Sequence, residues 1–205
     1  MRTLALCLAV SSLMALPLAA SAGDSPWTVK VGGSYIIPKG NNGALAGGAY
    51  EADVSSEMAF TPSIEYRFSP NVVAEVLLAI PVEHEVKDSL TDTKIATFKH
   101  LPPTVFAKYL ISPGEALSPY VGLGLNYTLV FDEKLEGSTS KLKGDDSFGL
   151  AAVAGFEYRP AGSPWGVALD VRYIKIKSDL TLDGADIGSL TVDPLVVGLS
   201  AAYHY

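Results

Sequence analysis

Apolar and polar residues alternate along the last stretch of the chain. From Leu195 onward every second residue is apolar or aromatic, and four of the residues between them are small or polar: Gly198, Ser200, Ala202 and His204. A period of two is typical of a β-strand with one apolar face. The strand runs to Tyr205, and chain ends fray unless they are tied into a sheet. The pattern therefore predicts a paired terminal strand that ends in an aromatic residue.

The same alternation recurs along the chain and predicts eight strands. Their expected ranges are 27–38, 56–68, 71–83, 100–112, 118–131, 146–159, 165–177 and 191–205. Three connections are short, whereas those near 39–55, 84–99, 132–145 and 178–190 are much longer. Outer-membrane barrels have short periplasmic turns and long extracellular loops. The sequence thus predicts an all-β fold, an eight-stranded antiparallel transmembrane up-and-down β-barrel, and its terminal strand resembles that of bacterial outer-membrane barrels.

Most aromatic residues fall on the face that this alternation points outward. One group lies at the strand ends beside the short turns: Trp27, Phe68, Tyr109, Tyr158, Trp165 and Tyr205. A second group lies toward the long loops: Tyr35, Phe60, Phe131, Phe148 and Tyr173. Two aromatic girdles are typical of the two interfaces of a membrane. A soluble β-sandwich would instead bury its aromatic residues in one layer.

The beginning of the chain has the pattern of a secretory signal peptide. Arg2 supplies a positive charge, an apolar run follows from Leu4 to Leu18, and Ala20-Ser21-Ala22 forms a cleavage site. We expect residues 1–22 to be removed and residues 23–205 to form the barrel, so the only cysteine, Cys7, is lost with the signal. Beyond it no apolar run reaches the roughly 18 residues that suggest a membrane helix. An exported apolar chain of this kind is either a soluble periplasmic domain or a barrel.

Composition and charge exclude several other functions. A net charge of −7 argues against a nucleic-acid partner. His84, His100 and His204 do not have the spacing of metal ligands, and no motif implies a cofactor, so we expect neither a metal nor a cofactor. The acidic residues of the outer loops are interpreted as solvated, with cations that bridge lipopolysaccharide as the alternative: Asp132, Glu133, Glu136, Asp145 and Asp146.

The inward positions divide into two groups by height. The periplasmic half carries charges of both signs: Lys30, Glu65, Arg67, Glu75, Lys108, Glu157, Arg159, Asp170 and Arg172, with His204 nearby. Unpaired burial of charge is costly, and an eight-stranded barrel is just wide enough to be filled by side chains, so we expect these residues to form a plug. The outer half is expected to form an apolar pocket lined by Ile36, Leu77, Ala79, Val130, Ile174, Ile176 and Val196.

Prolines are concentrated near the outer ends of the third and fourth strands. They are Pro81, Pro102 and Pro103. Proline has no N–H to donate to a β-ladder and weakens strand pairing. We interpret these three residues as marking a lateral opening through which an apolar molecule leaves the barrel. The alternative is that they only bend the rim.

Four segments of the chain together resemble the OmpW family of outer-membrane barrels. They are His100-Leu-Pro-Pro-Thr104, the run from Pro119 to Tyr127, Asp146-Ser-Phe-Gly149, and Asp193-Pro194 before the terminal strand; Asp170-Val-Arg-Tyr-Ile174 is similar to the alkane-uptake branch. The resemblance implies a narrow channel for small hydrophobic molecules with lateral release into the outer membrane. It also implies a constriction of a leucine and a tryptophan. Leu77 matches the leucine, but Arg172 stands at the tryptophan position, which predicts closure by an Arg172 ion pair with Glu75 or Asp170.

The favoured function is passive uptake of small hydrophobic molecules across the bacterial outer membrane. One alternative is a structural, adhesive or receptor barrel without transport. Another is a small membrane enzyme that uses His84 with Asp88 and Ser89. The expected partners are outer-membrane lipids, lipopolysaccharide, hydrophobic solutes and the barrel-assembly machinery, which would bind the terminal strand ending at Tyr205.

Overall fold

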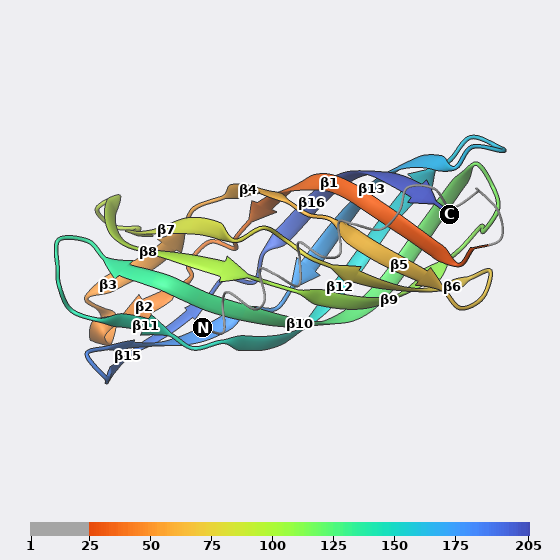
Figure 1. Cartoon of the computed structure of the whole chain (residues 1–205). Coiled ribbons are helices and arrows are strands. Elements are labelled where there is room, and N and C mark those ends of the chain that lie inside the picture. Colours follow the sequence, from red (N-terminus) through yellow and green to blue (C-terminus); the bar gives the residue numbers. More distant parts are fainter. Residues whose placement is uncertain (1–24) are drawn as a thin grey trace.

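The computed structural model describes residues 25–205, so the expected signal peptide at 1–22 lies outside the described residues. Within that range no helix has the length and apolar character needed to cross a membrane. Nearly every element is an antiparallel strand (Figure 1). The exception is a single short 3-10 turn, η1 (Ala46–Gly48).

Eight strands close into a ring. They are β1 (Trp27–Ile37), β5 (Ser63–Arg67), β6 (Val72–Leu77), β9 (Thr104–Leu110), β10 (Leu117–Leu135), β12 (Ser147–Tyr158), β13 (Trp165–Ile174) and β16 (Leu195–His204). The pairing of β10 with β12 completes the ring, and β4 (Glu57–Phe60) continues β5 along β1. The terminal strand lies between β1 and β13, with Thr28 opposite His204 and Trp165 opposite Tyr203. The predicted eight-stranded antiparallel barrel is confirmed.

The strand faces follow the predicted alternation. Buried and exposed residues alternate without a break along β13. Outward aromatic side chains such as Trp165, Tyr158 and Phe148 are exposed, because lipid rather than protein covers this face in the membrane. Phe106 and Tyr120 point inward instead and are fully buried.

The four long connections are not loops, and this part of the sequence interpretation is wrong. They contain seven further strands: β2 (Gly43–Leu45), β3 (Tyr50–Val54), β7 (Val82–Asp88), β8 (Thr93–Leu101), β11 (Leu142–Gly144), β14 (Lys177–Leu182) and β15 (Ala185–Thr191). These strands gather at the end of the barrel opposite the C-terminus and lengthen its wall there (Figure 1). Their outward residues are charged, as in Glu83, Glu85 and Lys87 of β7, because water covers this part of the wall. An alternation of apolar with charged residues was therefore mistaken for a polar loop.

Candidate functional site

A network of buried ion pairs fills the periplasmic half of the bore. The Lys30 ammonium lies 3.0 Å from a carboxylate oxygen of Glu65 and 3.0 Å from one of Glu157. Lys108 binds the same Glu65 and lies 3.3 Å from Glu75. At Lys108 and Glu75 the side chains are only 1% exposed. Each cation is thus shared between two carboxylates, which offsets the cost of removing these charges from water.

A second ion pair lies within the same network. Arg172 Nη2 donates to Asp170 Oδ2 at 2.8 Å, and the Tyr120 hydroxyl donates to the same oxygen at 3.0 Å. The Tyr120 ring lies 4.2 Å from Lys108 Nζ and so connects the two groups of charges. Gly122 faces this level, where a Cβ atom would lie 2.9 Å from Lys108 Cγ. The bore is therefore packed with side chains at this height.

The structure places most of the expected plug residues in this network, but not all of them. Seven are buried: Lys30, Glu65, Glu75, Lys108, Glu157, Asp170 and Arg172. Arg67 and Arg159 lie lower, where they line a polar cup of about 460 Å³ at the periplasmic mouth. His204 lies between the two groups, with Nε2 2.5 Å from Glu157. Arg172 forms its ion pair with Asp170 rather than with Glu75.

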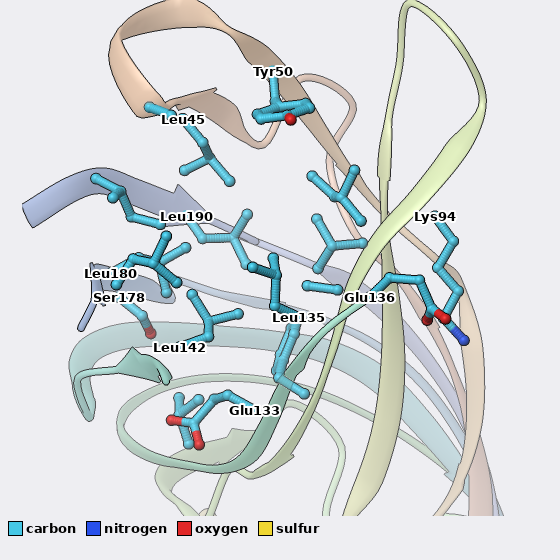
Figure 2. A pocket seen from close by; sticks show the side chains of 18 of the residues that line it. Leu45, Tyr50, Lys94, Glu133, Leu135, Glu136, Leu142, Ser178, Leu180 and Leu190 are labelled. Atoms are coloured by element: carbon cyan, nitrogen blue, oxygen red, sulfur yellow. The ribbon is translucent and has the colours of Figure 1, made fainter. Parts of the chain in front are cut away.

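The outer half of the barrel holds an apolar cavity of about 560 Å³. Leucines from strands far apart in the sequence point toward this common space (Figure 2). Its lining includes Leu45, Val86, Ile95, Phe98, Leu135, Leu142, Leu180, Leu182, Ile187, Leu190 and Val192. Exposed Tyr50, Glu136 and Gly137 also line it and place its mouth at the extracellular end. The volume lies within the range of about 300–1,000 Å³ that is usual for ligand pockets.

The cavity lies farther out than the apolar residues chosen from the sequence. Of those residues, Val130 and Ile176 line it. Ile36, Leu77, Ile174 and Val196 belong to the packed core, and Ala79 is buried outside the cavity lining. The leucines of the cavity were missed because they fall in segments interpreted as loops. The available signal was the spacing of Leu180, Leu182 and Leu190 within polar stretches, which is the alternation of strands.

Two stacked histidines lie at the side of the cavity nearer the membrane. The rings of His84 and His100 are 4.8 Å apart and nearly parallel, with an interplanar angle of 9°. His84 is fully buried and its Nδ1 lies 2.7 Å from the Ser55 carbonyl oxygen, so Nδ1 carries the proton. Burial lowers the pKa of His84, which keeps the ring neutral. Within residues 25–205 no cluster of three or more metal-ligating side chains forms.

The hydrogen-bond ladder that joins β6 to β9, and farther out β7 to β8, is interrupted at the prolines. Pairing of β6 with β9 ends at Leu77 opposite Thr104, and pairing of β7 with β8 begins at Val82 opposite His100. The residues between these two paired regions form backbone hydrogen bonds only with the strands on their opposite edges. Ile80 N–H donates to the Phe60 carbonyl at 3.1 Å, whereas the Pro103 carbonyl accepts from Tyr127 N–H at 3.1 Å. Pro81, Pro102 and Pro103 thus flank one gap in strand pairing.

The residues named for the enzyme alternative have separate partners. Asp88 accepts from the Thr91 hydroxyl at 2.7 Å and from Glu51 N–H at 3.1 Å. Ser89 Oγ contacts Glu51 at 3.5 Å, and His84 is bound to Ser55. Among the acidic outer residues, Asp132 pairs with Lys99, Asp146 accepts from Tyr127 and Glu133 accepts from Gly144 N–H. These groups hold the extracellular wall together.

Comparisons with known proteins place the chain in a defined group. The model of the OmpW family matches residues 25–205. Outer membrane protein W of Vibrio cholerae is 36% identical over 197 residues, which cover 89% of each chain. The crystal structure of the outer membrane protein OprG from Pseudomonas aeruginosa has a TM-score of 0.75 at 28% identity and covers 88% of this chain and 97% of that one. The solid-state NMR structure of outer membrane protein AlkL in lipid bilayers has a TM-score of 0.66 at 27% identity, with 90% and 93% covered.

Proposed function

The chain belongs to the OmpW family of bacterial outer-membrane β-barrels, and from that premise we propose that it is a passive uptake channel for small hydrophobic molecules. Members of this family are non-enzymatic membrane barrels. The observation that carries the proposal is the apolar cavity at the extracellular end, which lies above a bore packed with ion pairs. Such a cavity takes up an apolar solute but gives an ion no polar path downward.

The exit in this proposal is sideways. A solute in the cavity cannot continue through the plug without separating Lys30 and Lys108 from their buried carboxylates, which is expensive. The gap in strand pairing at Pro81, Pro102 and Pro103 offers the alternative route, because no backbone hydrogen bonds between the two walls need to break there. The solute then enters the hydrocarbon of the outer membrane directly. Release into the membrane requires no energy source.

Uptake by whole cells tests this proposal. A deletion strain and the same strain carrying the wild-type gene are given labelled alkanes, fatty acids and aromatic compounds, and initial accumulation is measured. Faster accumulation of at least one class in the complemented strain supports transport. Equal accumulation of every class with and without the gene would favour a structural, adhesive or receptor barrel.

Two further interactions belong to the same proposal. Outer-membrane lipids and lipopolysaccharide contact the exposed apolar face between the two aromatic girdles. The barrel-assembly machinery recognises the terminal strand, whose last residue Tyr205 donates its N–H to the Trp27 carbonyl at 3.2 Å in the folded barrel. Truncation of Tyr205 is therefore expected to impair assembly rather than transport by assembled barrels.

A further inference from the structure

One of the polar side chains that line the apolar cavity is a buried histidine without a hydrogen-bond partner among the described residues. His100 lines the cavity and is only 3% exposed. Within residues 25–205 neither of its ring nitrogens has a hydrogen-bond partner; the neighbouring His84 binds Ser55 through Nδ1, while its own Nε2 is buried without a partner. Buried polar groups in proteins are nearly always hydrogen-bonded, and an exception calls for a ligand or water. His100 therefore presents an unused hydrogen-bonding group to whatever occupies the cavity.

The position of His100 is fixed by its neighbours. Its ring stacks on that of His84, whose own orientation is set by the 2.7 Å hydrogen bond to the Ser55 carbonyl. Its backbone lies between Val82 of β7 and Val130 of β10. A ring held in this way loses little conformational freedom when it binds a ligand, which favours binding.

A second polar group lies on the strand that pairs with β8 at His100: Thr128 is two residues before Val130, the residue opposite His100. Thr128 of β10 is fully buried and lines the cavity, and its hydroxyl donates to Asn126 Oδ1 at 2.7 Å. With its proton committed to Asn126, the Thr128 oxygen is left as an acceptor. The lysine of the lining, Lys94, is not a free cation, because it pairs with Glu85 at 2.9 Å; among the carboxylates of the lining, Glu133 accepts from Gly144 N–H. This side of the cavity suits a neutral group that can both donate and accept.

We propose that the cavity binds apolar molecules that carry a terminal hydroxyl group, with the hydroxyl held by His100 and Thr128 and the hydrocarbon tail among the leucines. This rests on the proposed function and narrows its substrate class from hydrocarbons to long-chain alcohols. A saturated hydrocarbon leaves the His100 ring without a hydrogen-bond partner and offers nothing to the acceptor lone pair of the Thr128 oxygen. Sites built to bind a hydroxyl discriminate against analogues that lack it for this reason.

The test compares two probes of similar shape, 1-decanol and undecane, in which a methyl group replaces the hydroxyl. The full barrel in lipid nanodiscs is titrated with each probe, and binding is followed by the NMR shifts of the Ile176 and Leu180 methyl groups, both in the cavity lining. The ratio of the two affinities is measured for wild type and for His100→Phe, which keeps an aromatic ring stacked on His84. We expect the preference for the alcohol to fall about three- to tenfold in the variant, the worth of one hydrogen bond.

Two further variants separate the possible outcomes. Ile176→Val, in which binding is followed by the Leu180 methyl signals, is the control, because it removes apolar contact and should weaken both probes alike. If His100→Phe does not fold, Thr128→Val tests the binding of the ligand hydroxyl instead. It too should lower the preference for the alcohol. An unchanged ratio in every folded polar variant, with both probes still bound, overturns the hydroxyl site but leaves the uptake proposal intact. Failure of both probes to shift the wild-type methyl signals overturns both proposals.

Discussion

The periplasmic half of the bore buries seven charged side chains in one network, whereas the outer half holds a cavity lined mainly by leucine, isoleucine and valine. One strand contributes to both halves, since β10 runs from Tyr120 at the plug to Leu135 at the cavity. The contrast shows what each chemistry can do in a barrel of one width. Paired charges fill space and hold the walls at a fixed distance, while apolar side chains can leave a space that stays available to an apolar ligand.

Breaking the plug should produce the largest effect. Arg172→Ala leaves the Asp170 carboxylate buried with only the Tyr120 hydroxyl as partner. Removing one member of a buried ion pair typically costs about 3–5 kcal/mol, so we expect a loss of that size in the free energy of unfolding, measured by urea denaturation in lipid.

The same variant tests the closure of the bore. Wider space at this level should raise single-channel conductance in planar bilayers, because water replaces the guanidinium. Lys87→Met is the control, since it breaks the exposed pair with Asp92 away from the cavity and should leave both the conductance and the unfolding midpoint unchanged. Unchanged conductance in Arg172→Ala would show that this ion pair does not close the bore.

A polar group in the cavity should produce the next largest effect. Leu180 is buried and lines the cavity. In Leu180→Gln the amide must lose water when an apolar ligand binds, and a cost of about 1.4 kcal/mol corresponds to a tenfold loss of affinity for undecane. Leu90→Gln is the matched control, because Leu90 is 74% exposed in the turn after β7. Equal losses in both variants would argue against binding in this cavity.

Replacing prolines so that the two strands can pair across the gap should have a smaller effect. The double variant Pro102→Ala, Pro103→Ala supplies two backbone N–H groups where the ladder between the two walls is interrupted. If one new hydrogen bond closes the gap with about 1 kcal/mol, release of bound undecane into lipid should slow about fivefold while its equilibrium affinity stays the same. The measurement is the dissociation rate by NMR exchange. An unchanged rate would place the exit elsewhere.

The plug was predictable from the sequence, whereas the cavity was not. Lys30, Glu75 and Arg172 each fall on the inward phase of a strand whose outward residues are apolar, so local alternation is enough to place them. Leu45 and Leu190 come together only because β2 and β15 pack against each other above the membrane, and no local pattern specifies that contact. The gap at Pro81 depends equally on which strands are neighbours. The residues whose inward position follows from the pattern of a single strand could be predicted from the sequence. The features that depend on which strands are neighbours could be found only in the structure.

The smallest expected effect is the pH dependence of stability that comes from His84, which is neutral where the plug residues are charged. His84 lies beyond the membrane, at a height where Glu83, Lys99 and Asp132 carry charge on the outer face. Burial lowers its pKa, against the opposing influence of the Ser55 carbonyl and Glu57. The unfolded chain therefore binds the proton more readily, and stability present above the ordinary histidine pKa of about 6.5 is lost as the pH falls below it. Between about pH 7.5 and about pH 6 we expect wild type to lose more stability than His84→Phe in urea unfolding, with an upper limit of about 0.8 kcal/mol that is reached when the folded ring takes up no proton. Parallel pH profiles for the two proteins would mean that His84 accepts its proton within the folded wall.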